Sequence, residues 1–242
     1  MTELILSDIT RMGPGHCIIG LERVGSAYRS VRPLPRFGNA WPKAFAHKRG
    51  ERLQFSLSLG SLVQRPHVED RPSTGAMTTV GAESEEVLVA CLRQAELAET
   101  VKDLFGCNVH ESPRGGAAVW IQPAEAIRSI CGASFENVRF RIVGDRLRAA
   151  LALPSGEALR SLPVVDREWN EFAEEVLRQT QGANQLQRVE RFLNRTMQEK
   201  LLHSPVLFAR IGLTRPDADG HCWLMLDSLF PEPQEEWLSD LQ

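Results

Sequence analysis

Alternation of apolar and polar residues predicts β-structure through most of the first third of the chain. The clearest case is residues 52–59, where Leu53, Phe55, Leu57 and Leu59 would share one face of a half-buried strand. Strands are predicted over residues 4–10, 17–24, 28–34 and 52–59, with a turn at residues 13–15. The polar segment 60–82 contains Pro and Gly and has no periodicity, so we expect an extended loop there.

A helix is predicted next, because Ser84 precedes two glutamates in the manner of a capped helix start. Apolar residues then recur every three or four positions as far as Gly106. A short strand is expected over residues 117–121, after the Gly115-Gly116 turn.

The second half of the chain repeats this order of elements. Strands are predicted over residues 138–143, 147–153, 158–165, 206–213 and 222–229, with helices that begin at Asp166 and over 183–202. Strands, a helical insertion and further strands, occurring twice, are typical of small five-stranded barrels. We therefore predict a β-rich α+β chain with two OB-like five-stranded β-barrels that carry helical insertions. The first would span residues 1–136 and the second 137–242, while a single larger mixed α+β domain is the alternative.

A short internal echo links the two halves. Ile9-Thr10-Arg11 is followed by Gly15-His16-Cys17, and Leu213-Thr214-Arg215 is followed by Gly220-His221-Cys222. Each pair would end one strand and begin its partner. A shared hairpin conformation explains the echo without a common function.

Composition places the chain among ordinary globular proteins, with 43% hydrophobic and 24% charged residues. Its five scattered cysteines include no C-x-x-C pair, which favours reduced thiols over a disulfide framework or a zinc ribbon. No run of about 18 apolar residues occurs, and the start of the chain lacks the features of a secretory signal. We expect a cytoplasmic protein without membrane contact.

The net charge of −3 conceals an uneven distribution. Residues 1–80 and 137–215 are basic, whereas residues 81–136 and 216–242 are acidic. Such asymmetry indicates either an anion-binding face or acidic segments that cover basic sheets. After the apolar strand 222–229, Pro231 and Pro233 should end the ladder, which leaves residues 234–242 as a short, mobile or partner-docked end.

The chain resembles the dual OB-fold domain found in bacterial conflict and antiphage gene clusters. The resemblance rests on four short segments and on the order of the predicted strands, which together cover most of the chain. The segments are Asp8-Ile9-Thr10-Arg11, Arg29-Ser30-Val31-Arg32-Pro33-Leu34, Pro66-His67-Val68-Glu69-Asp70 and Arg210-Ile211-Gly212-Leu213-Thr214-Arg215-Pro216. The resemblance implies two OB-like barrels and a role in sensing or holding nucleic acid or a nucleotide-like ligand in a multi-gene defence system. It also implies protein partners encoded in the same gene cluster.

The candidate binding residues are arginines and one loop. OB barrels bind single strands with basic and aromatic side chains, and the arginine guanidinium donates two parallel hydrogen bonds to a phosphate. The His67, Glu69 and Asp70 loop offers an acid–base or metal-binding group, or else it is held by its own backbone and arginine bonds. The predicted ligand-binding residues are Arg11, Arg29, Arg32, Arg65, His67, Asp70 and Arg215.

Two further groups carry weaker signals. His16-Cys17 and His221-Cys222 could together ligate zinc, but adjacent strand residues point to opposite faces, so each pair offers one ligand. The helix predicted over 183–202 has a basic stripe of Arg188, Arg191 and Arg195, which is either solvated or binds a partner or phosphate.

No phosphate-binding loop, dinucleotide fingerprint, nucleophile elbow or zinc-protease motif occurs in the sequence. The sequence therefore favours a non-catalytic protein that binds nucleic acid or a nucleotide through Arg11, Arg29 and Arg32, with no cofactor and no metal. A protein–protein adaptor that holds a partner enzyme is one alternative. A metal-assisted hydrolase centred on His67, Glu69 and Asp70 is the other.

Overall fold

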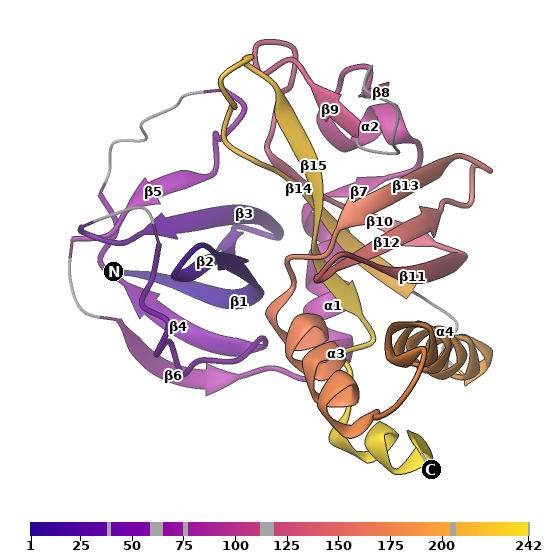
Figure 1. Cartoon of the computed structure of the whole chain (residues 1–242). Coiled ribbons are helices and arrows are strands. Elements are labelled where there is room, and N and C mark those ends of the chain that lie inside the picture. Colours follow the sequence, from indigo (N-terminus) through magenta and orange to yellow (C-terminus); the bar gives the residue numbers. More distant parts are fainter. Residues whose placement is uncertain (38–39, 59–64, 75–76, 112–118, 204–206, 242) are drawn as a thin grey trace.

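The computed structural model in Figure 1 describes the chain except for residues 38–39, 59–64, 75–76, 112–118, 204–206 and 242. The described strands form two six-stranded sheets and one three-stranded sheet. Helices pack against these sheets, so the predicted β-rich α+β class is confirmed. None of the described helices is long and apolar enough to cross a membrane.

The first sheet is built by the N-terminal third of the chain. Its strands are β1 (Thr2–Met12), β2 (Gly15–Val24), β3 (Ala27–Leu34), β4 (Glu51–Phe55), β5 (Asp70–Pro72) and β6 (Thr78–Ala82), in the order β5-β3-β2-β1-β4-β6. In Figure 1 these strands curve around a common interior. Residues such as Leu4, Ile18 and Phe55 fill that interior. The segment expected to be a loop thus contributes two short strands, β5 and β6, because it pairs with strands that are distant in sequence.

The helix predicted up to Gly106 is divided in two. Ser84 caps α1 (Glu85–Ala95) as expected, but Glu96 takes an extended conformation and ends it. After the short strand β7 (Leu97–Ala98), Thr100 and Asp103 form a new capping box that starts α2 (Val101–Phe105). Apolar side chains of α1 join residues of both six-stranded sheets in one small core.

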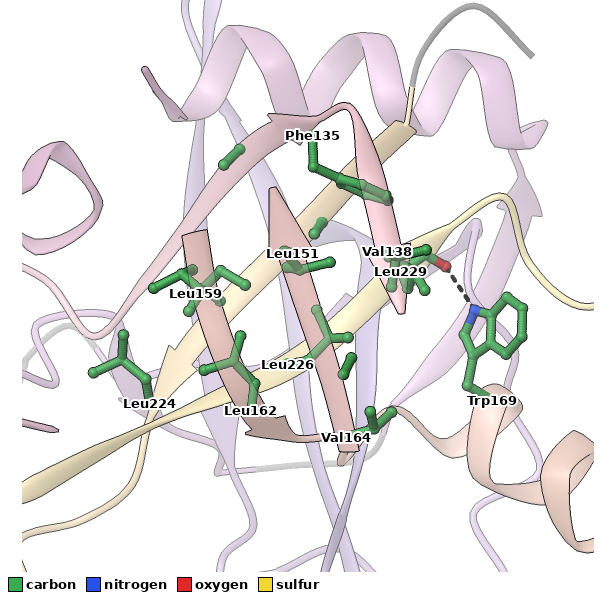
Figure 2. Close-up of a cluster of buried hydrophobic side chains, with 14 of the residues drawn as sticks. Phe135, Val138, Leu151, Leu159, Leu162, Val164, Trp169, Leu224, Leu226 and Leu229 are labelled. Atoms are coloured by element: carbon green, nitrogen blue, oxygen red, sulfur yellow. Dashed lines mark hydrogen bonds between the residues drawn. The ribbon is translucent and has the colours of Figure 1, made fainter. Parts of the chain in front are cut away.

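The remaining strands form the other two sheets. The second sheet has the order β7-β10-β14-β15-β9-β8, with β8 (His110–Glu111), β9 (Val119–Ile121), β10 (Ile130–Phe135), β14 (Leu207–Leu213) and β15 (Cys222–Phe230). The third is β11 (Asn137–Val143), β12 (Arg146–Ala152) and β13 (Ala158–Pro163). Val164 and Val165 then bond to the Leu226 region of β15 and join the third sheet to the second. Figure 2 shows the apolar core enclosed between them.

Two long helices flank this core. Asp166 caps α3 (Arg167–Gln179), and Trp169 in its first turn donates a hydrogen bond from Nε1 to the Leu229 carbonyl, 3.2 Å away (Figure 2). The α4 helix (Gln185–His203) lies along β11, where Asn194 and Glu190 accept backbone N–H bonds from the strand. These side chains occupy the free edge of β11 in place of another strand.

The C-terminal end differs from expectation. Residues Glu235–Leu241 form a 3-10 helix, and Trp237 is buried beside the rings of Trp169 and Phe172. The prediction of a mobile or partner-docked end is wrong for this part of the chain. The Trp237 indole packs into the core beside α3. Short-range sequence patterns do not reveal this contact.

Two five-stranded OB-like barrels are not confirmed. The sheets contain six, six and three strands, and β7 to β10, all within the predicted first half, pair with each other or with β14 and β15. The sheet pairing therefore does not follow the predicted division into residues 1–136 and 137–242, which remains a prediction. Strand β10 was not predicted from the sequence, because it is buried almost throughout and its residues do not alternate between apolar and polar.

Candidate functional site

The two six-stranded sheets meet along a polar contact that we call the seam, formed by β1 and β3 on one side and β14 and β15 on the other. Three charged residues of β1, β14 and β15 are buried here: Asp8, Arg210 and Asp227. The Arg210 guanidinium donates to Ser30 Oγ at 2.7 Å and lies 3.5 Å from Asp8 Oδ2. Buried charges of this kind persist because they are paired.

Arg32 of β3 is the second centre of the seam. Its Nη1 atom donates to Asp70 Oδ1 at 3.0 Å and lies 2.9 Å from His67 Nδ1, while Nη2 donates to Ser129 Oγ at 3.1 Å. Glu69 accepts bonds from both the backbone and the hydroxyl of Ser129. The 66–70 loop is thus held against the segment that leads into β10.

A cavity of about 570 Å³ opens beside these bonds. It lies where the ends of β1 and β14 approach each other. Its apolar lining is Met12, Leu34, Val165, Leu213 and Met225, and its polar lining is Thr10, Arg11, Cys17, Arg32, His67, Thr214, Arg215 and Asp227. Apolar walls with a few convergent polar groups are the usual character of a small-molecule site.

Three buried residues of this lining have polar atoms without a hydrogen-bond partner among the described residues. The atoms are Arg32 Nε, His67 Nε2 and Asp227 Oδ1, and their residues are 6%, 3% and 3% exposed. Each unsatisfied buried polar atom costs about 1–3 kcal/mol, so such atoms are few in native proteins. All three atoms are themselves buried, and their residues line the same cavity.

The contact with Arg32 determines which nitrogen of His67 carries the proton. A guanidinium can only donate, so His67 Nδ1 accepts and the neutral ring carries its proton on Nε2. Burial, followed by the charges of Arg32 and Arg215, lowers the pKa of His67 to about 3, although Asp70 and the Thr214 backbone oppose this shift. The ring is therefore neutral at physiological pH, and Nε2–H is a donor.

Asp227 supplies the opposite kind of group. Burial, followed by the charge of Asp8, raises the pKa of its carboxyl to about 8 despite the nearby Arg32 and Arg210. A protonated carboxyl both donates and accepts hydrogen bonds. The carboxyl lies directly over Gly212, where a Cβ would stand 2.0 Å from Asp227 Oδ2, so only glycine fits at that position of β14.

The structure brings four of the seven predicted site residues to this cavity and places three elsewhere. Arg11, Arg32, His67 and Arg215 line it, and Asp70 lies behind them, paired with both Arg32 and Arg215. Arg29 is exposed and pairs with Glu22 at 2.6 Å, beside a different cavity. Arg65 is exposed. Arg11, Arg29 and Arg32 therefore do not share one face, because Arg32 points into the seam.

The repeated Thr-Arg and Gly-His-Cys pattern of the two halves brings equivalent residues to the same cavity. Thr10 and Arg11 lie just before the end of β1, Thr214 and Arg215 directly follow β14, and all four line the same cavity. In both hairpins the threonine hydroxyl bonds to the partner strand, at the Cys17 carbonyl in one and at the Trp223 N–H in the other. Arg11 also pairs with Glu174 of α3.

The described residues offer one group of three that could hold a metal ion, namely Asp217, Asp219 and His221. Asp217 Oδ1 accepts the backbone N–H groups of Asp219 and His221, and Oδ2 accepts from Trp223, which accounts for this turn without an ion. The four residues His16, Cys17, His221 and Cys222 do not appear together in any such group of described residues.

Sequence reasoning missed the acidic partners of the seam. Asp8 and Arg210 were noted only within the segments of the family resemblance and Asp227 only within an apolar strand, and none of the three was a predicted site residue. The available signal was a charged residue inside a mainly apolar strand, such as Asp227 within residues 222–230. A buried ion requires a partner of opposite charge, so such a residue indicates a buried ion pair. Which partner it would meet depends on the contact between sheets and is not encoded locally.

The comparisons with known proteins provide no identity. No protein-family model matches the chain, and no curated protein matches it. One solved structure aligns with 94% of this chain and 95% of its own, at 10% identity and a TM-score of 0.33, and is described as a murine DNA-binding protein bound with double-stranded DNA. A likeness at this level supports no assignment of fold or function.

Proposed function

We propose that this chain is a binding protein that holds a small, nucleotide-like anion in the seam cavity. The observation that carries the proposal is a cavity of about 570 Å³ in which apolar walls adjoin the polar side chains of Arg32, His67 and Asp227.

The chemistry of the lining defines the ligand class. Arg32 and neutral His67 in the lining are of the donor type, and the Asp227 carboxyl both donates and accepts, a combination that suits the edge of a heterocyclic base. Met12, Leu34 and Met225 provide apolar surface for a ring. Arg11 and Arg215, with side chains 34% and 47% exposed, reach solvent and suit a phosphate at the cavity mouth.

The volume favours a mononucleotide over a polymer. About 570 Å³ falls within the range of drug-sized ligand sites. The dual OB-like architecture, the conflict-system family and gene-cluster partners stay proposals beside this one. Nothing in the seam cavity requires them.

The two alternative functions receive less support from the contacts. Glu69 and Asp70 are both engaged, with Ser129 and with two arginines, which favours a structural role for that loop over hydrolysis. An adaptor would use residues 234–242 as a partner-docked end, and Trp237 in this segment is buried in the protein's own core.

The test is isothermal titration calorimetry with AMP, GMP, CMP and UMP, with inorganic phosphate as a further titrant. We expect one-to-one binding of at least one nucleotide and about a tenfold loss of affinity in Asp227→Asn, the equivalent of about 1.4 kcal/mol. Asp219→Asn is the matched control, because Asp219 is exposed and outside the cavity.

Two results would contradict the proposal. One is the absence of binding by all four nucleotides at millimolar concentration. The other is equal affinity of the parent and Asp227→Asn, provided that the variant melts like the parent.

A further inference from the structure

The outer face of the three-stranded sheet carries a second concentration of arginines, far from the seam. Side chains at alternate positions of β11, β12 and β13 point away from the core, because their neighbours are buried. We define the arginine face as Arg139, Arg141, Arg148 and Arg160, which together line a hollow of about 530 Å³. Figure 1 shows this sheet on the side of the molecule away from β1 to β6.

The charge on this face is unbalanced. No acidic residue is among the described residues that line the hollow, and none of the four arginines forms an ion pair within the described chain. Arg141 and Arg148 stand directly opposite each other in the β11–β12 ladder. Like charges at such a position are destabilising unless an anion lies between them.

The floor of this hollow is formed mainly by small apolar residues. Between the arginines lie Ala150, Ala152 and Ala158, whose small side chains leave a flat, apolar surface. Arg148 is held in place by a 2.7 Å hydrogen bond from Nη1 to the Ser161 carbonyl. Ser161 itself adopts a left-handed backbone conformation, with φ of 54°, which is uncommon for a residue other than glycine.

The positive surface continues past β11. A second hollow of about 530 Å³ lies between β11 and α4, and it shares Arg139 and Arg141 with the first. Arg191 and Arg195 of α4 line its far side, and Arg195 also pairs with Glu199 at 3.8 Å. The single acidic residue in that lining, Glu190, accepts the Ile142 backbone N–H and is thereby engaged.

We propose that the arginine face binds the backbone of single-stranded nucleic acid. Residues two apart on a strand are about 6.7 Å apart, a spacing similar to that of successive phosphates in an extended single strand. The guanidinium planes can stack on unpaired bases, and the alanine floor gives those bases apolar contact. A duplex keeps its bases stacked inside and could not use that floor.

The absence of aromatic residues from the described lining of the β11–β13 hollow defines the mode of binding. Binding should depend mainly on charge, with little sequence preference, and should weaken steeply with salt. Four phosphate contacts correspond to a slope of about −3 in a plot of log Kobs against log salt concentration. This site is independent of the seam cavity, since the two linings share no residue.

The experiment is fluorescence anisotropy with a labelled oligothymidylate of about a dozen nucleotides, between about 50 and 200 mM salt. Arg139→Gln combined with Arg160→Gln should reduce the slope by about 1.4, or roughly half. Arg23→Gln combined with Arg36→Gln removes the same charge from exposed sites elsewhere and should leave the slope unchanged. Arg139→Lys with Arg160→Lys should keep the slope, because the charge remains.

Three outcomes would overturn the proposal. The first is a parent protein that does not bind the oligothymidylate, including one that binds phosphatidylserine vesicles or polyglutamate instead. The second is an equal loss of slope in both Gln pairs, which would indicate a diffuse charge effect. The third is a matched duplex that binds as tightly and with the same dependence on Arg139 and Arg160. Melting temperatures of all variants confirm that the fold is retained.

Discussion

The seam and the arginine face use the same residue type in opposite ways. At the seam, Arg32 and Arg210 are buried, and each meets at least one carboxylate that is distant in sequence. On the arginine face, Arg139, Arg141 and Arg160 are exposed and lack ion pairs within the described chain. The first set joins two sheets, whereas the second is available to an outside anion.

The difference shows that position, and not residue type, decides what an arginine does. Arg49 illustrates the structural extreme, since its side chain is fully buried between Asp166 and Glu232 and lies over the Phe230 ring. An arginine so enclosed cannot reach a ligand without breaking its pairs. Arg11 and Arg215 are intermediate, because they are paired and yet partly exposed at the cavity mouth.

The largest expected effect tests the structural side of this comparison. Arg210→Ala leaves the buried Asp8 and the partly buried Glu96 without their cation, so we expect a loss of about 3–5 kcal/mol in the free energy of unfolding. Urea denaturation measures this loss. Arg139→Ala, on the exposed face, should change stability by less than about 0.5 kcal/mol. Similar losses in both variants would show that the two sets do not differ as described.

The second effect concerns the pH dependence of the seam. The pKa of Asp227 is about 8 in the folded protein, against an ordinary value of 3.8, so the folded state holds a proton that the unfolded state releases. Stability from this group is therefore present below pH 4 and is lost as the pH rises to about 8, by at most about 1.4 kcal/mol per pH unit.

Asp227→Asn should remove this loss, and the gap in unfolding free energy between variant and parent should grow in favour of the variant from pH 5 to pH 8. His67 works in the opposite direction below pH 6.5, where its lowered pKa makes folding less favourable as the pH falls. Because both proteins contain His67, it cancels in the difference. A constant gap across this range would rule out a titrating Asp227.

The smallest effect concerns the arginine face. Arg141→Ala relieves repulsion with Arg148 directly across the ladder, and we expect a gain of about 0.2–1 kcal/mol in unfolding free energy at low salt. The gain should shrink as salt screens the charges. Thermal unfolding at two ionic strengths measures it. A loss of stability at low salt would mean that Arg141 has a partner within the folded chain.

Local pattern was enough to predict most elements and some of the site. The alternation expected in residues 52–59 appears in β4, and β11 and β12, the Ser84 cap and the amphipathic α3 and α4 form where they were predicted, because side-chain periodicity and capping act within a few residues. The same reading identified Arg32, His67, Asp70 and Arg215 as candidates. It could not separate Arg32 from Arg29, three residues away on the same strand.

Only the tertiary structure decided which sheet each strand joins and which charges meet. β10 shows no alternation because both of its faces are buried, and Trp237 is core because α3 happens to lie against it. The pairings of Arg32 with Asp70 and of Arg210 with Asp8 cross 38 and 202 positions of the chain. Burial strengthens these ion pairs and also raises the free-energy cost of an unpaired charge. The pairs therefore form where the sheets come into contact, and a short segment of sequence does not contain the information about that contact.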